Sequence, residues 1–282
     1  MRSLPKPTFT AEDVFTISIS RIQDRGLRAR LQACIPVIVR DSADYDVKAA
    51  QASLHEIPRS SVVNGNVTRD EMVAVYTGRM VNKNGPGRPY YEKLRHPDGD
   101  EDKCPFCGQL PTKTLDHYLA KTDYPSLAVS PNNLVPACRD CNARKSTTYP
   151  TRSEDETLHP YFDNIDSERW LFARVRQSSP ISLSFFIKSP YSASPLLAQR
   201  VKHHFEVFEL NTLYKAEAGT ELRHISWQMR TLFESGGASA VRRQLLERAE
   251  SSLQVGLNSW RGAMFDALAH DDWYCSQGVM LK

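Results

Sequence analysis

Apolar residues recur at helical spacing through the first third of the chain. They return every three or four positions over residues 14–22, just after Thr10 and Asp13, which form a potential helix-capping pair. The spacing continues through residues 27–54, where Pro36 indicates a kink or break. Thr68 is placed to cap a further helix. The pattern therefore predicts about four helices in this part of the chain.

Two turn-rich segments interrupt this pattern before the first cysteine pair. Residues 82–89 and 96–103 are rich in Gly, Pro and Asp, which favour loops, and they flank a short helix over residues 90–94. The second loop indicates a domain boundary near residue 100. We therefore separate an N-terminal helical region, residues 1–99, from a central module, residues 100–148.

The C-terminal region, residues 149–282, opens with a different periodicity. Two apolar runs rich in β-favouring residues lie within 169–188 and are separated by a Ser-Ser-Pro turn, which predicts a β-hairpin. From Ser194 onward the apolar spacing is helical again, and the pair Gly236-Gly237 interrupts it. The predicted fold class is α+β, mainly α.

Composition and charge narrow the class of protein only slightly. The 282 residues are 40% apolar and 24% charged, which is ordinary for a folded protein, and the formal charge of +3 is too small to indicate a partner. No apolar run approaches the roughly 20 residues that cross a bilayer, and the first residues lack the apolar stretch of a secretory signal. We therefore expect a cytoplasmic protein with no membrane association.

Four of the six cysteines form two pairs with metal-ligand spacing. The pairs are Cys104 with Cys107 and Cys138 with Cys141, each separated by two residues. This spacing lets two thiolates occupy neighbouring corners of a tetrahedron, and four sulfur ligands leave no open position for water. The sequence therefore predicts a structural zinc site. The alternative, four buried or redox-active thiols, requires two correctly spaced pairs to arise by accident.

Candidate catalytic residues lie between and just after these pairs. Asp116 and His117 are adjacent in a segment of extended character, and Asn142 follows the last cysteine directly. A carboxylate and an amide oxygen together suit Mg²⁺, which keeps several waters. The imidazole of His117 can meanwhile hold a water. The alternative is a surface pair without a metal.

The segments CPFC, TLDHYLAK and NNLVPACRDCNARK together resemble the HNH, or ββα-metal, nucleases, within them the four-cysteine type represented by phage endonuclease VII. The resemblance covers about forty residues. It implies a treble-clef-like ββα zinc module flanked by helical lobes. It also implies that His117 is the general base, that Asp116 and Asn142 bind the catalytic metal, and that Asn133 holds the loop in shape. More narrowly, DHYLAKTDYPSLAV running into NNLV is similar to HNH subunits of bacterial anti-phage defence systems such as Septu.

The implied reaction is metal-dependent hydrolysis of phosphodiester bonds, with 5′-phosphate and 3′-hydroxyl products. Aspartate in place of histidine before His117 favours Mg²⁺ or Mn²⁺ over zinc as the catalytic metal. Candidates for contacting phosphates of nucleic acid are Lys121, Arg144 and Lys145. Each of them is equally well explained as an exposed, solvated surface charge.

Partners follow from the same resemblance. We expect nucleic acid, with DNA ahead of RNA, and a homodimer if both strands are cut. The sequence contains no GxxxxGK[ST] loop, so an ATP-driven step would need a partner ATPase. The competing function is a non-catalytic zinc module that binds nucleic acid or protein.

Overall fold

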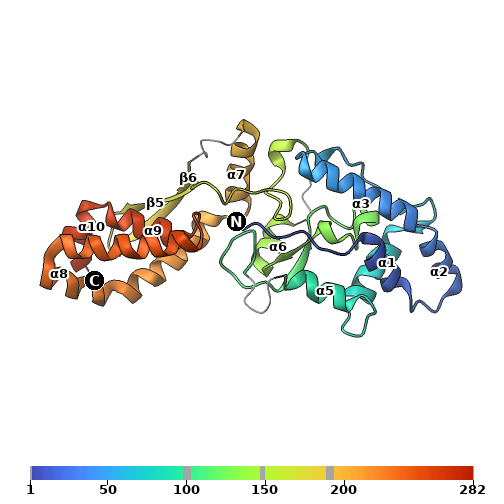
Figure 1. The fold of residues 1–282 in the computed structure, drawn as a ribbon, viewed down its shortest axis with the longest axis horizontal. Coiled ribbons are helices and arrows are strands. Elements are labelled where there is room, and N and C mark those ends of the chain that lie inside the picture. The colour runs from blue at the N-terminus through green and yellow to red at the C-terminus, as the bar shows by residue number, and fades with distance from the viewer. Residues whose placement is uncertain (1, 98–102, 147–149, 189–193, 282) are drawn as a thin grey trace. The chain divides into compact units, whose positions relative to one another are not determined.

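The chain forms two compact units, Met1–Asp163 and Asn164–Lys282. The computed structural model describes residues 2–97, 103–146, 150–188 and 194–281. Within these ranges the protein is mainly helical, with three two-stranded antiparallel sheets (Figure 1). The predicted α+β class, mainly α, is confirmed. The predicted boundaries at 99/100 and 148/149 lie outside the described residues, so the division into three regions stays a prediction.

The first unit contains six α-helices and two hairpins in its described part. The elements are α1 (Ala11–Ile19), α2 (Arg25–Gln32), α3 (Ile35–Ala50), β1 (Val62–Val63), β2 (Val67–Thr68), α4 (Arg69–Val75), α5 (Arg88–Arg95), β3 (Thr114–His117), β4 (Leu134–Ala137) and α6 (Arg139–Lys145). Short 3₁₀ turns are η1 (Leu54–Glu56), η3 (Pro125–Leu127), η4 (Pro131–Asn133) and η5 (Ser153–Asp155).

The predicted helix starts are present in the structure. Thr10 caps α1, and the Asp13 carboxylate accepts a hydrogen bond from the Thr10 backbone N–H, so both halves of a capping box are formed. Pro36 lies in the first turn of α3, where its missing N–H costs nothing. Thr68 caps α4 in the same way as Thr10 caps α1.

A π-helical segment, Tyr76–Val81, continues α4 where the apolar pattern predicts an ordinary helix. π-Helical turns are rare and occur often at functional sites, because the extra residue redirects side chains. Gly85, in the loop that follows, approaches this segment so closely that a Cβ would collide with the carbonyl of Arg79. The turn-rich loop thus packs back on the π-helix.

One core joins the N-terminal helices to the β3–β4 hairpin. Buried side chains of α1 to α5 pack with Leu115 of β3, Leu134 of β4, and Ala128 and Val129 between them. The hairpin is therefore held by apolar contacts on its helical side, which fixes the position of the residues that it carries.

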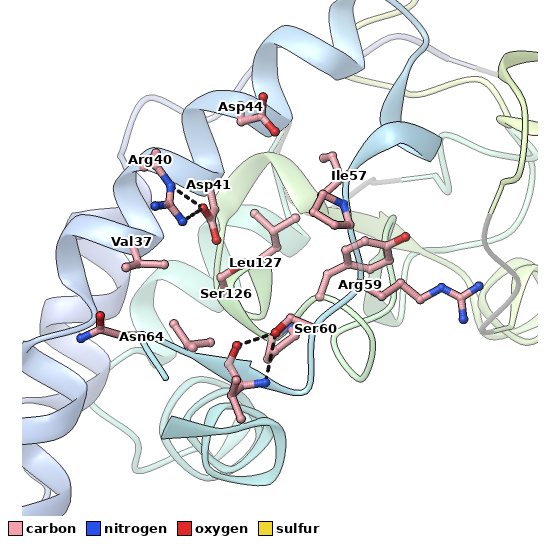
Figure 2. Close-up of a pocket in the computed structure, with 15 residues that line it drawn as sticks. Val37, Arg40, Asp41, Asp44, Ile57, Arg59, Ser60, Asn64, Ser126 and Leu127 are labelled. Atoms are coloured by element: carbon pink, nitrogen blue, oxygen red, sulfur yellow. Dashed lines mark hydrogen bonds and ion pairs between the residues drawn. The ribbon is translucent and has the colours of Figure 1, made fainter. Parts of the chain in front are cut away.

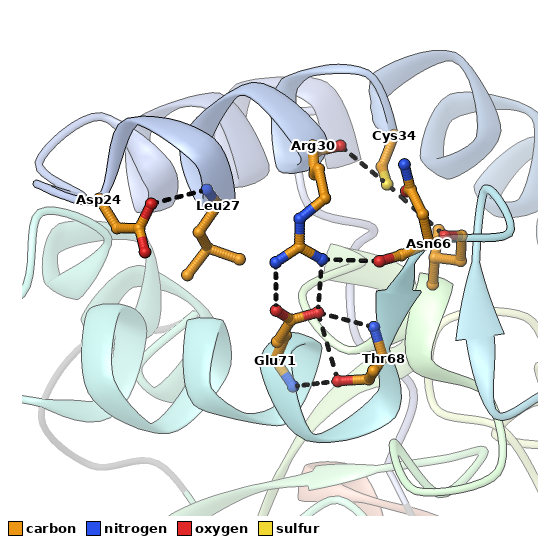
Figure 3. A network of polar contacts seen from close by, with 8 residues as sticks. Asp24, Leu27, Arg30, Cys34, Asn66, Thr68 and Glu71 are labelled. Atoms are coloured by element: carbon orange, nitrogen blue, oxygen red, sulfur yellow. Dashed lines mark hydrogen bonds and ion pairs between the residues drawn. The ribbon is translucent and has the colours of Figure 1, made fainter.

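An ion pair connects α2 to the start of α4 (Figure 3). The two terminal guanidinium nitrogens of Arg30 donate to the Glu71 carboxylate, at 2.6 and 3.0 Å, and Arg30 also donates to the Asn66 carbonyl. Glu71 also completes the capping box with Thr68. The hydrogen bonds from Arg30 and then from Thr68 lower the pKa of Glu71 to about 2.

Glu71→Gln is expected to destabilise the first unit by about 1 kcal/mol at pH 7, because the bidentate pair is half-exposed and screened by solvent. The folded pKa lies below the unfolded value of 4.5, so this contribution is present above pH 4.5 and is lost as the pH falls toward 2. Urea unfolding at pH 7 and pH 3 measures it. The matched control is Asp70→Asn, a fully exposed neighbour, which should change stability little at either pH.

The second unit combines a hairpin with a set of helices, and its α8 consists of two helical segments that meet at Gly237. Its elements are β5 (Leu171–Arg176), β6 (Ser182–Ile187), α7 (Pro195–Val207), α8 (Leu210–Val255), α9 (Trp260–Ala269), α10 (Asp272–Ser276) and the 3₁₀ turn η6 (Gly278–Met280). The predicted hairpin is confirmed, with Leu171 opposite Ile187. Gly237, at φ 66°, kinks α8 where the Gly-Gly pair predicts a break. Within the described ranges, no helix is long and apolar enough to cross a membrane.

Candidate metal and catalytic centre

The four paired cysteines meet in one buried cluster. The Sγ atoms of Cys104, Cys107, Cys138 and Cys141 all lie within 4.8 Å of one another. A tetrahedral zinc with Zn–S bonds of about 2.3 Å places its sulfurs about 3.8 Å apart, so the cluster is consistent with a zinc site. All four side chains are buried, and none forms a disulfide.

Backbone N–H groups support the thiolate form of this cluster. The Leu110 N–H donates to Cys107 Sγ, and the Cys141 N–H donates to Cys138 Sγ at the start of α6. Gly108, at φ 65°, makes the tight turn after Cys107. Hydrogen bonds among the four thiols lower the pKa of Cys107 and of Cys138, whereas burial raises the pKa of Cys104 and the neighbouring thiols raise that of Cys141.

The β3–β4 hairpin carries the two central candidate residues at consecutive positions of β3. Asp116 pairs with Val135 and His117 pairs with Leu134 across the strands, and α6 begins two residues after β4. Asp116 and His117 are 5% and 7% exposed, so both polar side chains are nearly removed from water. Burial of this kind is costly unless the groups are paired or used.

Lys145, in the last turn of α6, is the partner of Asp116. Its Nζ lies 3.1 Å from Asp116 Oδ2 and donates to the His117 carbonyl at 2.9 Å. It also lies 5.3 Å from the centroid of the Tyr118 ring. The contact with Asp116 is an ion pair without hydrogen-bond alignment, and Oδ2 accepts no hydrogen bond. Burial raises the pKa of Asp116, and the Lys145 ammonium offsets part of that rise.

The imidazole of His117 is held by a backbone carbonyl. Nε2 lies 2.9 Å from the carbonyl oxygen of Ala128, which can only accept, so Nε2 carries the proton and Nδ1 has the free lone pair. Tyr76, from the π-helix, contacts the ring edge-on at 4.4 Å between centroids. Burial, followed by the charge of Lys121, lowers the pKa of His117 to about 3, so the ring is neutral at physiological pH.

Asn133 closes the loop between the two strands. Its amide oxygen accepts from the Leu119 N–H at 2.7 Å, and its amide nitrogen donates to the carbonyls of Leu119 and Leu127 at 3.0 and 3.2 Å. The side chain is fully buried. These three bonds connect residues 119 and 127 across the loop that precedes Ala128.

The remaining candidates lie on α6 and in the segment that follows β3. Asn142 is half-buried, one turn before Lys145 on α6, and its side-chain amide makes no hydrogen bond within the described residues. The Lys121 ammonium lies 5.5 Å from the centroid of the Tyr76 ring, at the edge of the site. Arg144 is half-buried on α6. Lys145, considered above as a phosphate contact, points into the site.

Sequence reasoning missed three features of this site. Nothing in a linear pattern indicates that the Ala128 carbonyl orients His117, that Lys145 pairs with Asp116, or that Tyr76 covers the imidazole. Each contact joins residues at least eleven positions apart. The only local signal was the apolar run through Tyr76, which is also compatible with an ordinary helix.

A separate cavity of about 600 Å³ lies beside the same loop (Figure 2). Its walls come from α3, residues 57–64 and residues 124–127, and neither Asp116 nor His117 lines it. Arg40 and Asp41 form an ion pair at 2.8 Å on the wall that α3 contributes. Since residue 127 precedes Ala128, this cavity borders the segment that orients His117.

Comparison with known proteins finds relatives but no family model and no solved structure that match. The chain is 27% identical over 292 aligned residues to protein ea31 of Escherichia phage lambda, covering 96% of this chain and 98% of that protein. It is 35% identical over 66 residues to Septu protein PtuB of Bacillus thuringiensis, covering 22% of this chain and 25% of PtuB. Neither name states an activity. The chain is therefore related to a phage protein over its full length and to a Septu protein over about a quarter of that protein's length.

Proposed function

We propose that the protein is a metal-dependent HNH endonuclease that hydrolyses phosphodiester bonds in nucleic acid, with DNA as the first candidate. The observation that carries the proposal is the neutral charge and the tautomer of the His117 imidazole. A neutral imidazole, held through Nε2 by Ala128, has a free lone pair at Nδ1, and the buried carboxylate of Asp116 precedes it on β3. This arrangement suits a general base next to a metal ligand.

The residues present fit a hard divalent cation. Asp116 Oδ2 is buried, with the Lys145 ammonium 3.1 Å away, and the Asn142 side-chain amide has no hydrogen-bond partner in the described part of the chain. A carboxylate and an amide oxygen are ligands that Mg²⁺ and Mn²⁺ accept. The cation would supply charge neutralisation at the phosphate and at the leaving oxygen.

The proton transfer, the positioning of groups and the phosphate contacts would come from side chains of this protein. His117 would accept the proton of an attacking water at Nδ1. Its pKa of about 3 is low for a base, but an anionic phosphate beside the ring would raise its basicity. Asn133 would keep the Ala128 carbonyl in place, and the four-cysteine cluster would hold α6 against the hairpin. Lys121 and Arg144 are candidates for contacting neighbouring phosphates.

The partial similarity to PtuB supports a place in bacterial anti-phage defence as the nuclease component. One such site cuts one strand, so double-strand cleavage would call for a homodimer. The described part of the chain offers no nucleotide-binding loop of the GxxxxGK[ST] type, so an ATP-driven step would need a partner ATPase.

The test is cleavage of supercoiled plasmid, linear duplex, single-stranded DNA and RNA by wild type and His117→Ala, with Mg²⁺, Mn²⁺ or no divalent metal. We expect cleavage that needs metal and falls 10²- to 10⁴-fold in the variant, the usual contribution of a general base. Far-ultraviolet circular dichroism and zinc content serve as controls for folding. If His117→Ala still cleaves, and does so without divalent metal, the result would contradict the mechanism.

A non-catalytic zinc module is the second candidate, and one contact favours it. The Lys145 ammonium already balances the Asp116 carboxylate, so the site does not depend on a metal for charge neutrality. This function predicts binding of nucleic acid or protein, with no cleavage of any substrate by folded, zinc-loaded protein.

A further inference from the structure

A groove in the second unit combines an apolar floor with cationic walls. It encloses about 600 Å³ between α8, the start of β6 and the C-terminal segment. The larger apolar side chains that line it are Pro180, Ile181, Leu222, Tyr274, Val279 and Leu281. This volume and lining suit a flat organic group such as a nucleobase.

Three cations of α8 line the same groove. They are Lys215, Arg223 and Arg230, and no aspartate or glutamate is among the lining residues. Arg223 donates to the Thr220 hydroxyl and Arg230 to the Ser226 carbonyl, but none of the three forms an ion pair with a described residue. The lining of the groove is therefore positively charged, which favours an anionic occupant.

The three cations follow the helix axis. Eight residues separate Lys215 from Arg223 and seven separate Arg223 from Arg230, so the positions span about 22 Å at 1.5 Å per residue. Charges of one nucleic-acid strand repeat about every 3.4 Å along its axis, so the row is long enough to follow several phosphates. A small anion would need only one or two of these cations.

An exposed tryptophan stands at the edge of the row. Trp227 is 75% exposed, one turn after Arg223 and three residues before Arg230 on the same helix. An indole of this size exposed to water is unusual, and it offers a flat surface on which an unpaired base can stack. A duplex, whose bases are already stacked, would gain nothing from it.

We propose that this α8 groove, lined by Lys215, Arg223 and Arg230 and followed on the same helix by the exposed Trp227, binds single-stranded nucleic acid, with phosphates on the cations and a base on the indole or the apolar floor. The choice of nucleic acid among anionic partners rests on the proposed nuclease function. The groove lies outside the candidate catalytic residues, so binding and cleavage are separable.

The experiment measures fluorescence anisotropy of a labelled 20-nucleotide single strand with the full-length protein and without divalent metal. Charge reversal of Lys215, Arg223 and Arg230 to glutamate should weaken binding by at least about tenfold. It should also reduce the slope of log K against log salt by about 2, since each single-strand phosphate contact contributes about 0.7. The matched control reverses three exposed cations elsewhere in the unit, Lys188, Lys202 and Arg243, for the same change in net charge, and should bind as wild type does.

Trp227→Ala tests the stacking separately. Wild-type tryptophan fluorescence should be quenched by the strand mainly at Trp227, because Trp170 and Trp260 are buried and Trp273 is half-buried against Gly278, and most of the quenching should be lost in the variant. Equal binding by the groove and control reversals would overturn the inference, as would tighter binding of duplex than of single strand. The plasmid assay is scored independently. If the wild type cleaves plasmid but the groove reversals bind the strand as the control does, only the proposed binding groove is wrong. If binding depends on the groove but no substrate is cleaved, only the proposed nuclease activity is wrong.

Discussion

Cys138→Ser combined with Cys141→Ser is expected to abolish zinc binding and unfold the candidate catalytic module. Structural zinc contributes about 10 kcal/mol or more to small modules of this kind, which is comparable to the whole stability of a domain. The two residues lie at the start of α6, which carries Asn142 and Lys145. Their loss would therefore release α6 from the hairpin. Zinc content by mass spectrometry and thermal unfolding by circular dichroism measure both effects.

Cys275→Ala is the control for a buried thiol outside the cluster. Cys275 is also fully buried, but its Sγ contacts the Leu268 carbonyl in the second unit. This variant should keep one zinc per chain and lose only the packing of one small side chain. A double serine variant that retains both zinc and wild-type stability would show that the four cysteines do not form the metal site.

Lys145→Met is expected to destabilise the first unit by about 3 to 5 kcal/mol at pH 7. The substitution leaves the Asp116 carboxylate buried without its counter-charge, and breaking a buried pair from one side costs about this much. Removal of both charges in Lys145→Met with Asp116→Asn should recover most of the loss, because no charge then remains buried. Chemical unfolding of the two single variants and the double variant measures the coupling.

Added Mn²⁺ distinguishes a metal site from a purely structural ion pair. If Asp116 binds a divalent cation, Mn²⁺ should restore stability to Lys145→Met and should stabilise it more than it stabilises wild type, where the ammonium competes for the carboxylate. The Lys145→Met, Asp116→Asn protein should show no such gain. Equal responses of wild type and Lys145→Met to Mn²⁺ would argue against metal binding at Asp116.

Local patterns of sequence determined much of this protein. The helix starts at Thr10 and Thr68, the hairpin over residues 169–188 and the kink at Gly237 all follow from interactions within a few positions along the chain. The two cysteine pairs belong to the same category, because CxxC spacing places two sulfurs on one turn. That the two pairs would come together was predictable only because a tetrahedral zinc site needs four ligands.

Tertiary structure alone decided the chemistry of the individual groups. His117 owes its tautomer to a carbonyl eleven residues away, and Asp116 owes its counter-charge to Lys145, twenty-nine residues away. The α8 groove likewise depends on residues 180–182 and 274–281 closing over one helix face. Periodicity and spacing report how a segment presents its own side chains. They do not report which distant groups fill the space opposite, and burial against those groups sets charge, tautomer and shape.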